Sequence, residues 1–292
     1  MSAADLGLFY CAAVWGATFY LVKDSLSGIA PETLVAYRFL LSAALLLPWV
    51  AKRGKKAARH LREGFILAVL LTILYVSQTI GLKYTTASSS GFITGLFVIF
   101  VPLFLLVFAR KPPTRAQWAA TALALAGLWL LTGGVSRLNH GDVLTLAAAV
   151  TYAGHLLATD AFVREDADPI LLAFHQFWMT GVMSLLFAVR QGAPLSVGGW
   201  GPARVVGFLA LFPTLIAFYV QLVAQKRTAA IKVSLIFSLE PVFAALFAWT
   251  LGGEPFVPQR AVGGALIVCA MVTSELGKLG LLRGRRKEVL PA

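Results

Sequence analysis

The sequence predicts an all-α integral membrane protein, with ten transmembrane helices arranged as two inverted five-helix repeats around a central cavity. The first reason is composition: 59% of the 292 residues are hydrophobic and 13% are charged, whereas a soluble globular domain carries about 25% charged residues. The second is a set of ten apolar runs, and the third is an uneven distribution of Lys and Arg between them. Too few polar residues remain to cover a water-facing exterior, so we expect the exterior to face lipid.

The apolar runs have the length that a membrane span needs. A hydrocarbon core about 30 Å thick is crossed by about 20 residues of α-helix. The runs cover residues 5–22, 32–50, 63–82, 88–108, 116–133, 140–163, 169–189, 203–226, 231–251 and 259–281. The least distinct separations are the gap at 83–87 and the start of the ninth run. The first run has no basic segment before it and no A-x-A cleavage pattern, so we expect it to be a retained helix.

The basic residues mark one side of the membrane. With ten spans, both chain ends and every second loop share a side, which holds 18 of the 25 Lys and Arg residues, against six on the other side. Cytoplasmic loops are enriched in Lys and Arg, so both termini are expected in the cytoplasm. The basic tail 283–292 is expected to anchor this topology, with binding of anionic lipid as the alternative. The formal charge of +12 is thus explained without nucleic-acid binding.

The two halves of the chain repeat the same features in the same order. The matching pairs are Lys83 and Lys226, Thr85 and Thr228, Pro112 and Pro255, Asp24 and Asp160, Pro31 and Pro169, and Arg38 and Gln176. An odd number of helices per copy turns the second copy upside down, an architecture that recurs in secondary transporters. We expect a first repeat in 1–134, an inverted second repeat in 135–282 and a basic tail in 283–292.

Short motifs near the repeat boundaries resemble one known family. They are Lys83-Tyr84-Thr85-Thr86-Ala87-Ser88, Gly91-Phe92-Ile93-Thr94-Gly95, Val101-Pro102-Leu103, Ser238-Leu239-Glu240-Pro241-Val242-Phe243 and Gly252-Gly253-Glu254. Together they resemble the EamA-like ten-helix exporters of the drug/metabolite transporter superfamily, over nearly the whole chain. Arg110-Lys111-Pro112 stands where the family often has a Gly-Glu pair, so this loop departs from the pattern.

The resemblance implies a secondary transporter of the bacterial inner membrane that exports small metabolites by alternating access, without ATP and without a cofactor. Amino acids, aromatic or other neutral ones, are the expected substrates. Another carrier of the same fold, such as a multidrug or cation exporter, is the alternative, and a channel-like pore or an intramembrane enzyme is the alternative from another class. The motifs leave monomer and homodimer open, and the GxxxG pair Gly91 and Gly95 suits close packing within one chain or between two.

Enzyme and metal chemistry lack their usual signatures. The sequence has no HExxH, GxSxG or Walker A motif and no paired intramembrane aspartates. His155 and Asp160 are five residues apart, an unsuitable spacing for a metal pair. Cys11 and Cys269 lie in separate apolar runs, outside any CxxC or Cys/His cluster, and are expected to be small buried hydrophobes. No metal site and no enzymatic activity are therefore expected.

Polar side chains inside the spans are costly in lipid and tend to face the bundle interior or a water-filled path. Their helical spacing aligns Thr151, Tyr152, His155 and Thr159 in span six, Gln176, Thr180 and Ser184 in span seven, and Thr214, Gln221 and Gln225 in span eight. We expect the cavity to be lined by Trp15, Arg38, Tyr75, Gln78, Thr79, Tyr152, His155, His175, Gln176, Trp178, Tyr219 and Gln221. The alternative is that such Ser, Thr and Gln residues only tie helices together, at about 0.6 kcal/mol per bond.

Two charged residues and two prolines inside the spans have candidate roles in transport. Arg38 is a candidate to bind a substrate carboxylate, or to form a structural salt bridge with an acidic residue near the membrane surface. Glu240, His155 and His175 are candidates to bind and release a coupling proton. Glu240 could equally accept hydrogen bonds from the backbone groups that Pro241 leaves without partners. Pro102 and Pro241 interrupt corresponding helices of the two halves, and act as hinges or as static kinks that shape the cavity.

Overall fold

The structure is a computed structural model, and it describes residues 3–110, 114–132, 138–165, 167–228, 233 and 236–278. Helices make up the regular structure of these residues, and no strand occurs among them. They are α1 (Ala3–Ser25), α2 (Pro31–Ala51), η1 (Gly54–Ala58), α3 (Leu61–Gly81), α4 (Ala87–Gly95), α5 (Phe97–Ala109), α6 (Arg115–Thr132), α7 (His140–Arg164), α8 (Pro169–Arg190), α9 (Trp200–Leu209), η3 (Ala210–Ile216), α10 (Ala217–Gln225), α12 (Glu240–Thr250) and α13 (Pro258–Lys278).

The helices follow the ten apolar runs of the sequence. Seven stretches are long and apolar enough to cross a membrane, counting α4–α5 and α9–α10 as one span each, and shorter apolar helices occupy 118–131 and 258–273. The remaining run contains α12, whose first residue is Glu240. The start of that run lies outside the described residues, as do Lys111-Pro112-Pro113, Gly133-Gly134 and the tail 283–292. The protein is a multi-pass α-helical membrane protein.

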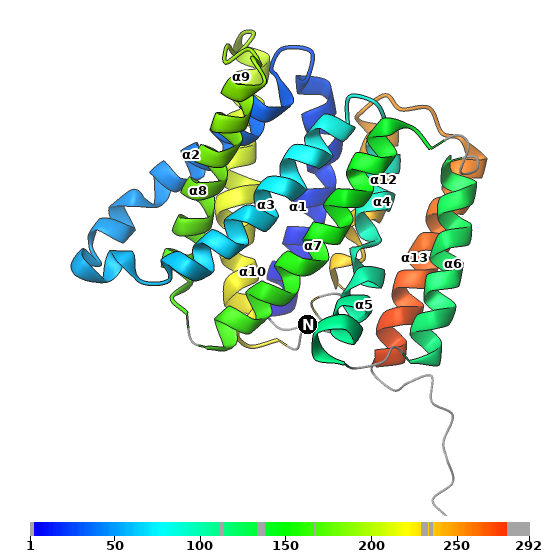
Figure 1. The fold of residues 1–292 in the computed structure, drawn as a ribbon. Helices are drawn as coiled ribbons and strands as arrows, with labels where there is room; N and C mark the ends of the chain where they lie inside the picture. The colour runs from blue at the N-terminus through cyan, green and yellow to red at the C-terminus, as the bar shows by residue number, and fades with distance from the viewer. Residues whose placement is uncertain are drawn as a thin grey trace, which may run out of the picture.

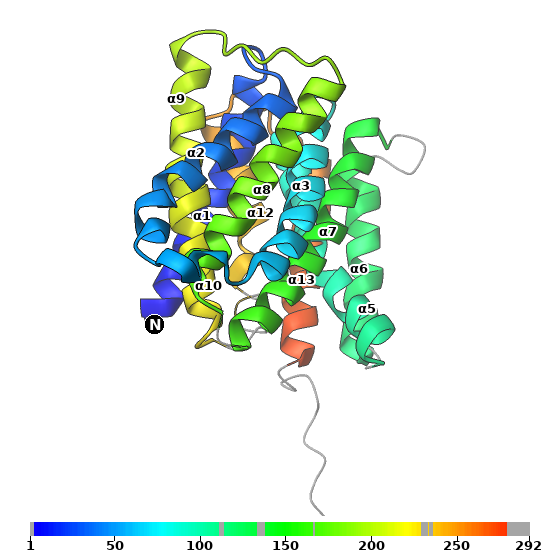
Figure 2. The same cartoon turned by 60° about the vertical axis from the view of Figure 1, so that its left-hand side comes forward.

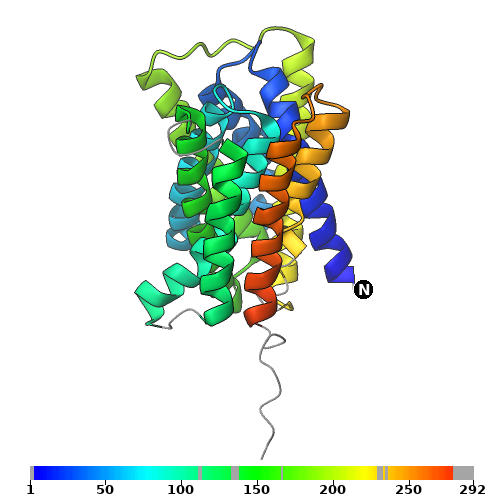
Figure 3. The same cartoon turned by 90° about the vertical axis from the view of Figure 1, so that its right-hand side faces the viewer.

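The two halves of the bundle run in opposite directions. In Figure 1, α1 starts on the face that carries the N-terminus and α7 runs toward that same face. The last described residues of α13 lie on this face too, as Figures 1 and 3 both show. We call it the chain-end face and the other the opposite face. An even number of spans returns the chain to the side on which it began, and this agrees with the inverted-repeat fold.

Backbone details recur between the halves at nearly the spacing of the sequence repeat. Pro31 and Pro169 each open their helix, α2 and α8. Arg110, after α5, and Gly253, after α12, both have positive φ, 52° and 64°, and are 143 residues apart. The helix starts of α1 and α7, Ala3 and His140, are 137 residues apart. The same turns therefore close corresponding helices in both halves.

The helix is interrupted inside the fourth and the eighth span, and the interruption of the fourth span is not at Pro102. The helix breaks at Leu96, between α4 and α5, where Ile99 N donates to Leu96 O at 2.8 Å in place of a regular α-helical bond. In the eighth span, α9 and α10 are joined by the π-helical turn η3, which contains Pro213. π-turns inside α-helices occur frequently at functional sites. Both interruptions lie in the interior of the bundle, next to α1, α2 or α12.

Both glycines of the GxxxG pair of α4 pack against other helices of the same chain. A Cβ atom on Gly91 would lie 2.4 Å from that of Ala244 in α12, and one on Gly95 would lie 3.1 Å from Pro241. At one edge of the bundle, α6 and α13 pack against each other (Figures 1 and 2). A Cβ atom on Gly127 of α6 would lie 2.7 Å from the carbonyl oxygen of Gly263. Small residues thus let corresponding helices of the two halves approach closely.

A closer approach of α3 and α7 gives a testable effect on stability. A Cβ atom at Gly141 would lie 2.4 Å from Gly81 O and 2.9 Å from Thr85 N, both backbone atoms. Gly141→Ala is expected to destabilise the protein by about 1–3 kcal/mol, as overpacking does in cores. Gly207→Ala is the control, because that position in α9 has open space. Thermal unfolding of the detergent-purified variants checks this, and equal melting temperatures for the two would contradict the close contact.

Candidate functional site

An interior cavity lies where helices of both halves meet. Its volume is about 20 Å³, and its walls are Trp15, Thr18, Leu71, Leu74, Tyr75, Gln78, Thr94, Tyr152, His155, Phe218 and Glu240. One water molecule needs about 10–15 Å³ measured in the same way. The cavity thus has room for a water molecule but not for a metabolite in this conformation. A solute reaches these residues only if the surrounding helices move apart.

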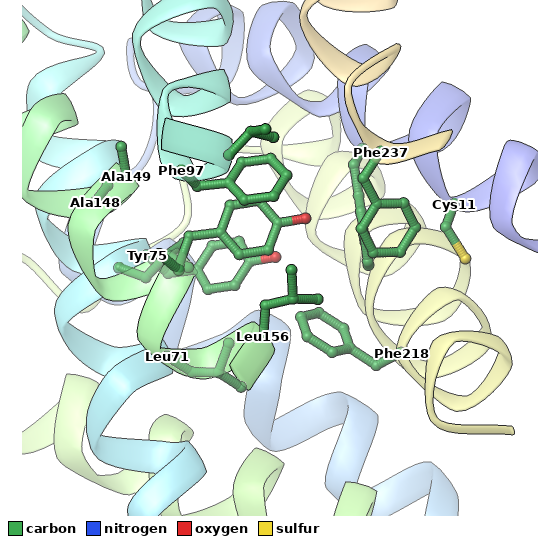
Figure 4. Packing of buried hydrophobic residues seen from close by; sticks show 14 of the residues in the cluster. Cys11, Leu71, Tyr75, Phe97, Ala148, Ala149, Leu156, Phe218 and Phe237 are labelled. Carbon is green, nitrogen blue, oxygen red and sulfur yellow. The ribbon is translucent and has the colours of Figure 1, made fainter. Parts of the chain in front are cut away.

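Aromatic rings form a large part of the wall, through Trp15, Tyr75, Tyr152 and Phe218. Trp15 stands edge-on to Phe237 at 5.0 Å between ring centroids, and Phe39 stands edge-on to Tyr75 at 5.0 Å. Figure 4 shows Tyr75, Phe97, Phe218 and Phe237 gathered from different helices into one interior cluster. Such rings cover a large apolar surface and leave their polar tips for hydrogen bonds. The site therefore combines an apolar body with a few polar groups.

Glu240 brings a carboxyl group into this aromatic site. It is the first residue of α12 and is 6% exposed. The hydroxyl of Tyr152 donates to its Oε2 at 3.3 Å. Pro241 follows directly, and because proline lacks an N–H, it leaves one fewer backbone donor at this helix start. An ionisable group in the middle of a membrane bundle is costly and marks a functional position by default.

Gln78 and the pair His155–Gln176 supply neutral polar groups. Gln78 Nε2 of α3 donates to Thr94 Oγ1 of α4 at 3.0 Å, two residues before the break at Leu96. His155 of α7 shares a 3.0 Å hydrogen bond with Gln176 of α8. Gln176 and Thr79 are buried beside the cavity rather than in its wall. These groups are the types that bind the ends of a small polar solute.

Arg38 lies behind Tyr75. Its side chain is 2% exposed, its Nε donates to Thr214 Oγ1 at 2.5 Å, and its guanidinium carbon lies 4.5 Å from the centroid of the Tyr75 ring. The Nη2 atom is buried and has no hydrogen-bond partner. Tyr75 itself lines the cavity, so its ring separates the guanidinium group from the cavity wall. An acidic partner for Arg38 is not found among the described residues.

The π-turn η3 is held by side chains of the first two helices. Trp15 Nε1 donates to Pro213 O at 2.7 Å, and Ser42 Oγ donates to Ala210 O at 2.8 Å. Thr214 Oγ1, the acceptor for Arg38, donates to Leu209 O at 2.7 Å. The carbonyls that the π-turn frees are thus satisfied by side chains from α1 and α2. A movement of either helix is therefore transmitted to η3.

Several residues expected in the cavity lie elsewhere. His175 Nε2 donates to Ala57 O at 2.9 Å, and Trp178 Nε1 donates to His175 Nδ1 at 3.2 Å, so this pair packs against η1. Tyr219 is 38% exposed and lines a groove on the outer surface with Leu211 and Leu215. Gln221 is 1% exposed and outside the cavity wall. Pro102 is inside α5, six residues after the break at Leu96.

Sequence reasoning missed the apolar part of the wall. Leu71, Leu74 and Phe218 line the cavity but are ordinary residues of apolar helices. Phe218 carries no local signal, because one neighbour along the chain, Tyr219, looks the more functional of the two and faces outward. Only the helical spacing of three and seven residues from Phe218 to Gln221 and Gln225 places it on the polar stripe. That stripe is the one signal that points to it.

On the opposite face a set of hydrogen bonds joins three helices and two loops. Lys23 Nζ donates to Leu82 O at 2.8 Å and to Thr85 O at 2.6 Å. Thr85 Oγ1 donates to Asp142 Oδ1 at 2.6 Å, and Ser88 donates to the Glu254 carboxylate through both its N–H and its hydroxyl. We call this set the clasp. It ties α1, the loop before α4, the start of α4, α7 and the loop after α12 together on that face.

Loss of one bond in the clasp has a measurable cost. Thr85→Val keeps the shape of the side chain and removes the donor to the buried Asp142 carboxylate, which is expected to cost about 1–3 kcal/mol. Thr151→Val is the matched control, because the Thr151 hydroxyl bonds only within its own helix, to Ala147 O and Ala148 O. The melting temperatures of both variants give the comparison. A Thr85→Val protein as stable as Thr151→Val would show that the clasp bond contributes nothing.

Comparison with known proteins decides the family. A profile of the EamA-like transporter family matches residues 2–133 and again residues 139–274. The chain belongs to the EamA-like transporter family. The two matches correspond to the two repeats of the fold, and the family is a branch of the drug/metabolite transporter superfamily.

Relatives cover nearly the full length. An uncharacterized transporter of Archaeoglobus fulgidus is 30% identical over 94% of this chain and 86% of its own. The inner membrane transporter YedA of Escherichia coli K12 is 26% identical over 93% and 90%. A Chlamydia trachomatis S-adenosylmethionine/S-adenosylhomocysteine transporter is 24% identical over 92% and 88%. A solved crystal structure, 21% identical over 97% of this chain and 99% of that one, has a TM-score of 0.71 and supports the fold. The chain is thus a membrane transporter of small metabolites.

Proposed function

We propose that this protein exports amino acids, with aromatic and other neutral ones as the preferred substrates, across the bacterial inner membrane by alternating access. The observation that carries the proposal is the placement of the Glu240 carboxyl group inside an aromatic cavity shared by both repeats. An ammonium group binds a carboxylate, and aromatic faces attract cations. The rings in turn suit an apolar side chain. An α-amino acid offers these groups at one end and its side chain at the other.

The relatives support this class of solute. S-adenosylmethionine, which appears in the name of the Chlamydia trachomatis relative, contains an α-amino-acid group. The cavity has amide and hydroxyl groups for the polar end, on Gln78, Thr94 and Tyr152. Arg38 lies one ring away from the cavity and supplies a positive charge for the carboxylate. Glu240 is then the site for a coupling proton, which competes with the substrate ammonium group.

The two faces of the bundle are assigned from charge. The loops expected on the chain-end face hold most of the Lys and Arg residues, which supports a cytoplasmic location for that face. Export then runs from the chain-end face, through the cavity, to the opposite face. A fluorescent protein fused to the C-terminus reports this directly. Fluorescence of the fusion in bacterial cells supports a cytoplasmic end, and activity of an alkaline phosphatase fused at the same point contradicts it.

Transport in proteoliposomes tests the function. The purified protein is reconstituted and preloaded with each of a panel of unlabelled amino acids, and uptake of the same labelled amino acid is followed with and without a pH gradient. A carrier accelerates uptake by exchange in a saturable way, whereas a pore does not. Saturable exchange of at least one neutral amino acid is the expected result. Exchange of organic cations alone, or uptake without saturation, would replace the proposal by its alternatives.

A further inference from the structure

Buried polar groups without partners gather between the cavity and the chain-end face. Among the described residues, both amide atoms of Gln221 and of Gln225, the hydroxyl of Thr159, Nδ1 of His155 and Nε2 of Gln176 make no hydrogen bond. Each of these side chains is at most 1% exposed. A buried polar group without a partner costs about 1–3 kcal/mol. Such a concentration is expected where water or a solute supplies the missing bonds.

These groups lie on helix faces that meet. Phe218 of α10 packs against His155 of α7, at 5.9 Å between ring centroids, and against Phe177 of α8, at 5.7 Å. Gln221 and Gln225 follow Phe218 on the same stripe of α10, three and seven residues on, so they point into the same seam. Thr159 follows His155 by one turn of α7. The stripes of α7 and α10 both run from the cavity toward the chain-end face, where these helices end.

The first repeat has fewer such groups toward the opposite face, where the equivalent of Gln176 is Arg38 with its unpartnered Nη2. Counted from the starts of α1 and α7, Val22 corresponds to Thr159, whereas the Asp24–Asp160 match pairs Thr159 with Lys23; Leu82 stands where the second half has Gln225. Gln78 corresponds to Gln221, but its Nε2 donates to Thr94. Lys23, next to Val22, is bonded to Leu82 O and Thr85 O in the clasp. Apart from Arg38, these equivalent positions are therefore apolar or hydrogen-bonded toward the opposite face, and polar without partners toward the chain-end face.

We infer that Thr159, Gln176, Gln221 and Gln225, with His155 at its inner end, line a hydrated access path from the chain-end face to the cavity. This inference rests on the proposed transport function and adds the route and its selectivity. The path offers amide, hydroxyl and imidazole groups and no fixed charge. It therefore suits neutral and zwitterionic solutes, which exchange hydrogen bonds with water along it, and disfavours multiply charged ones. The clasp keeps the other half of the route closed in the same conformation.

Thiol accessibility tests the path independently of transport. In a background with Cys11→Ala and Cys269→Ala, single cysteines are introduced as Thr159→Cys and Gln225→Cys, and as Val22→Cys and Leu82→Cys at the equivalent positions of the first repeat. A membrane-impermeant maleimide is added to either face of oriented membrane vesicles. We expect the first pair to react about tenfold faster than the second, from the chain-end face only, because thiol reactivity follows water access. The amount of maleimide that each variant binds after unfolding, when its cysteine is fully accessible, gives the reference for that variant.

Equal rates at all four positions, or faster reaction at Val22→Cys and Leu82→Cys, would overturn the path. Hydroxyl-radical labelling of the wild-type protein gives the comparison without substitution, since it modifies side chains beside water. His155 is expected to be modified and Phe19, buried under the clasp, to stay unmodified; the reverse pattern also overturns the path. If the protein exchanges amino acids saturably but the positions on both faces are labelled equally, the access path is rejected and the proposed function stands. If the labelling is as expected but no amino acid is exchanged, the access path stands and the proposed substrate class is rejected.

Discussion

Replacing Glu240 by glutamine is expected to abolish the accumulation of substrate that a pH gradient drives, down to the level of empty liposomes. Glutamine keeps the shape and the acceptor for the Tyr152 hydroxyl, but it cannot bind and release a proton. Glu240 is buried in the cavity wall, where solute and proton reach the same carboxyl group. Intramembrane carboxyl groups of this kind serve as proton relays in transporters. The measurement is uptake of the amino acid identified by counterflow, with and without the gradient.

Two further variants separate coupling from damage. Glu165→Gln changes an exposed carboxyl group after α7 and is expected to leave accumulation unchanged. Tyr152→Phe removes the hydroxyl that lies 3.3 Å from Glu240 and is expected to lower the rate without uncoupling transport. Accumulation by Glu240→Gln at the wild-type level would assign the coupling proton elsewhere, with His155 as the next group in the cavity wall.

The fold was largely predictable because its signals are local. The length of the apolar runs fixes the spans, and the prolines that open α2 and α8 recur in order. The π-turn η3 was not predictable. Pro213 indicates a kink, but the turn also depends on Trp15 and Ser42, which reach its carbonyls from α1 and α2. The break at Leu96 likewise carries no proline or glycine at its own position. Such interruptions depend on packing between helices that are distant in sequence.

The candidate site was predictable where polarity and spacing agree. Trp15, Tyr75, Gln78, Tyr152 and His155 were expected in the cavity and line it, and Glu240, expected as a proton-coupling candidate, lies in the same wall. His175 and Tyr219 were not separable from their neighbours by residue type. One residue along a helix turns a side chain by about 100°, so His175 faces η1 while Gln176 faces His155. Tyr219 turns outward in the same way, beside the inward Phe218. Phase errors of one residue, not errors of composition, account for these misplacements.

Arg38→Gln is expected to raise the KM for the transported amino acid by about 30-fold or more, and to leave the KM for its decarboxylated amine unchanged. Loss of one partner of a buried charged pair costs about 2–5 kcal/mol, and only the amino acid carries the carboxylate. Glutamine is the natural residue at the equivalent position of the second repeat, Gln176, where it is fully buried. The concentration dependence of uptake in proteoliposomes, measured for both compounds, gives the two KM values.

A structural role for Arg38 predicts a different pattern. If its bond to Thr214 only holds α2 against η3, Arg38→Gln lowers the melting temperature and slows transport of the acid and the amine alike. Arg38→Lys keeps the positive charge but loses the Nε donor. If Arg38 binds the substrate carboxylate, this variant keeps the preference for the amino acid over the amine. If Arg38 is structural, this variant is destabilised and slowed like Arg38→Gln. The present geometry favours the first case for a physical reason. The guanidinium group is a buried charge without an acidic partner among the described residues, and its Nη2 donor is unused. Arg38 lies directly beside Tyr75 of the cavity wall, so we expect a movement of this ring to let a substrate carboxylate complete the pair.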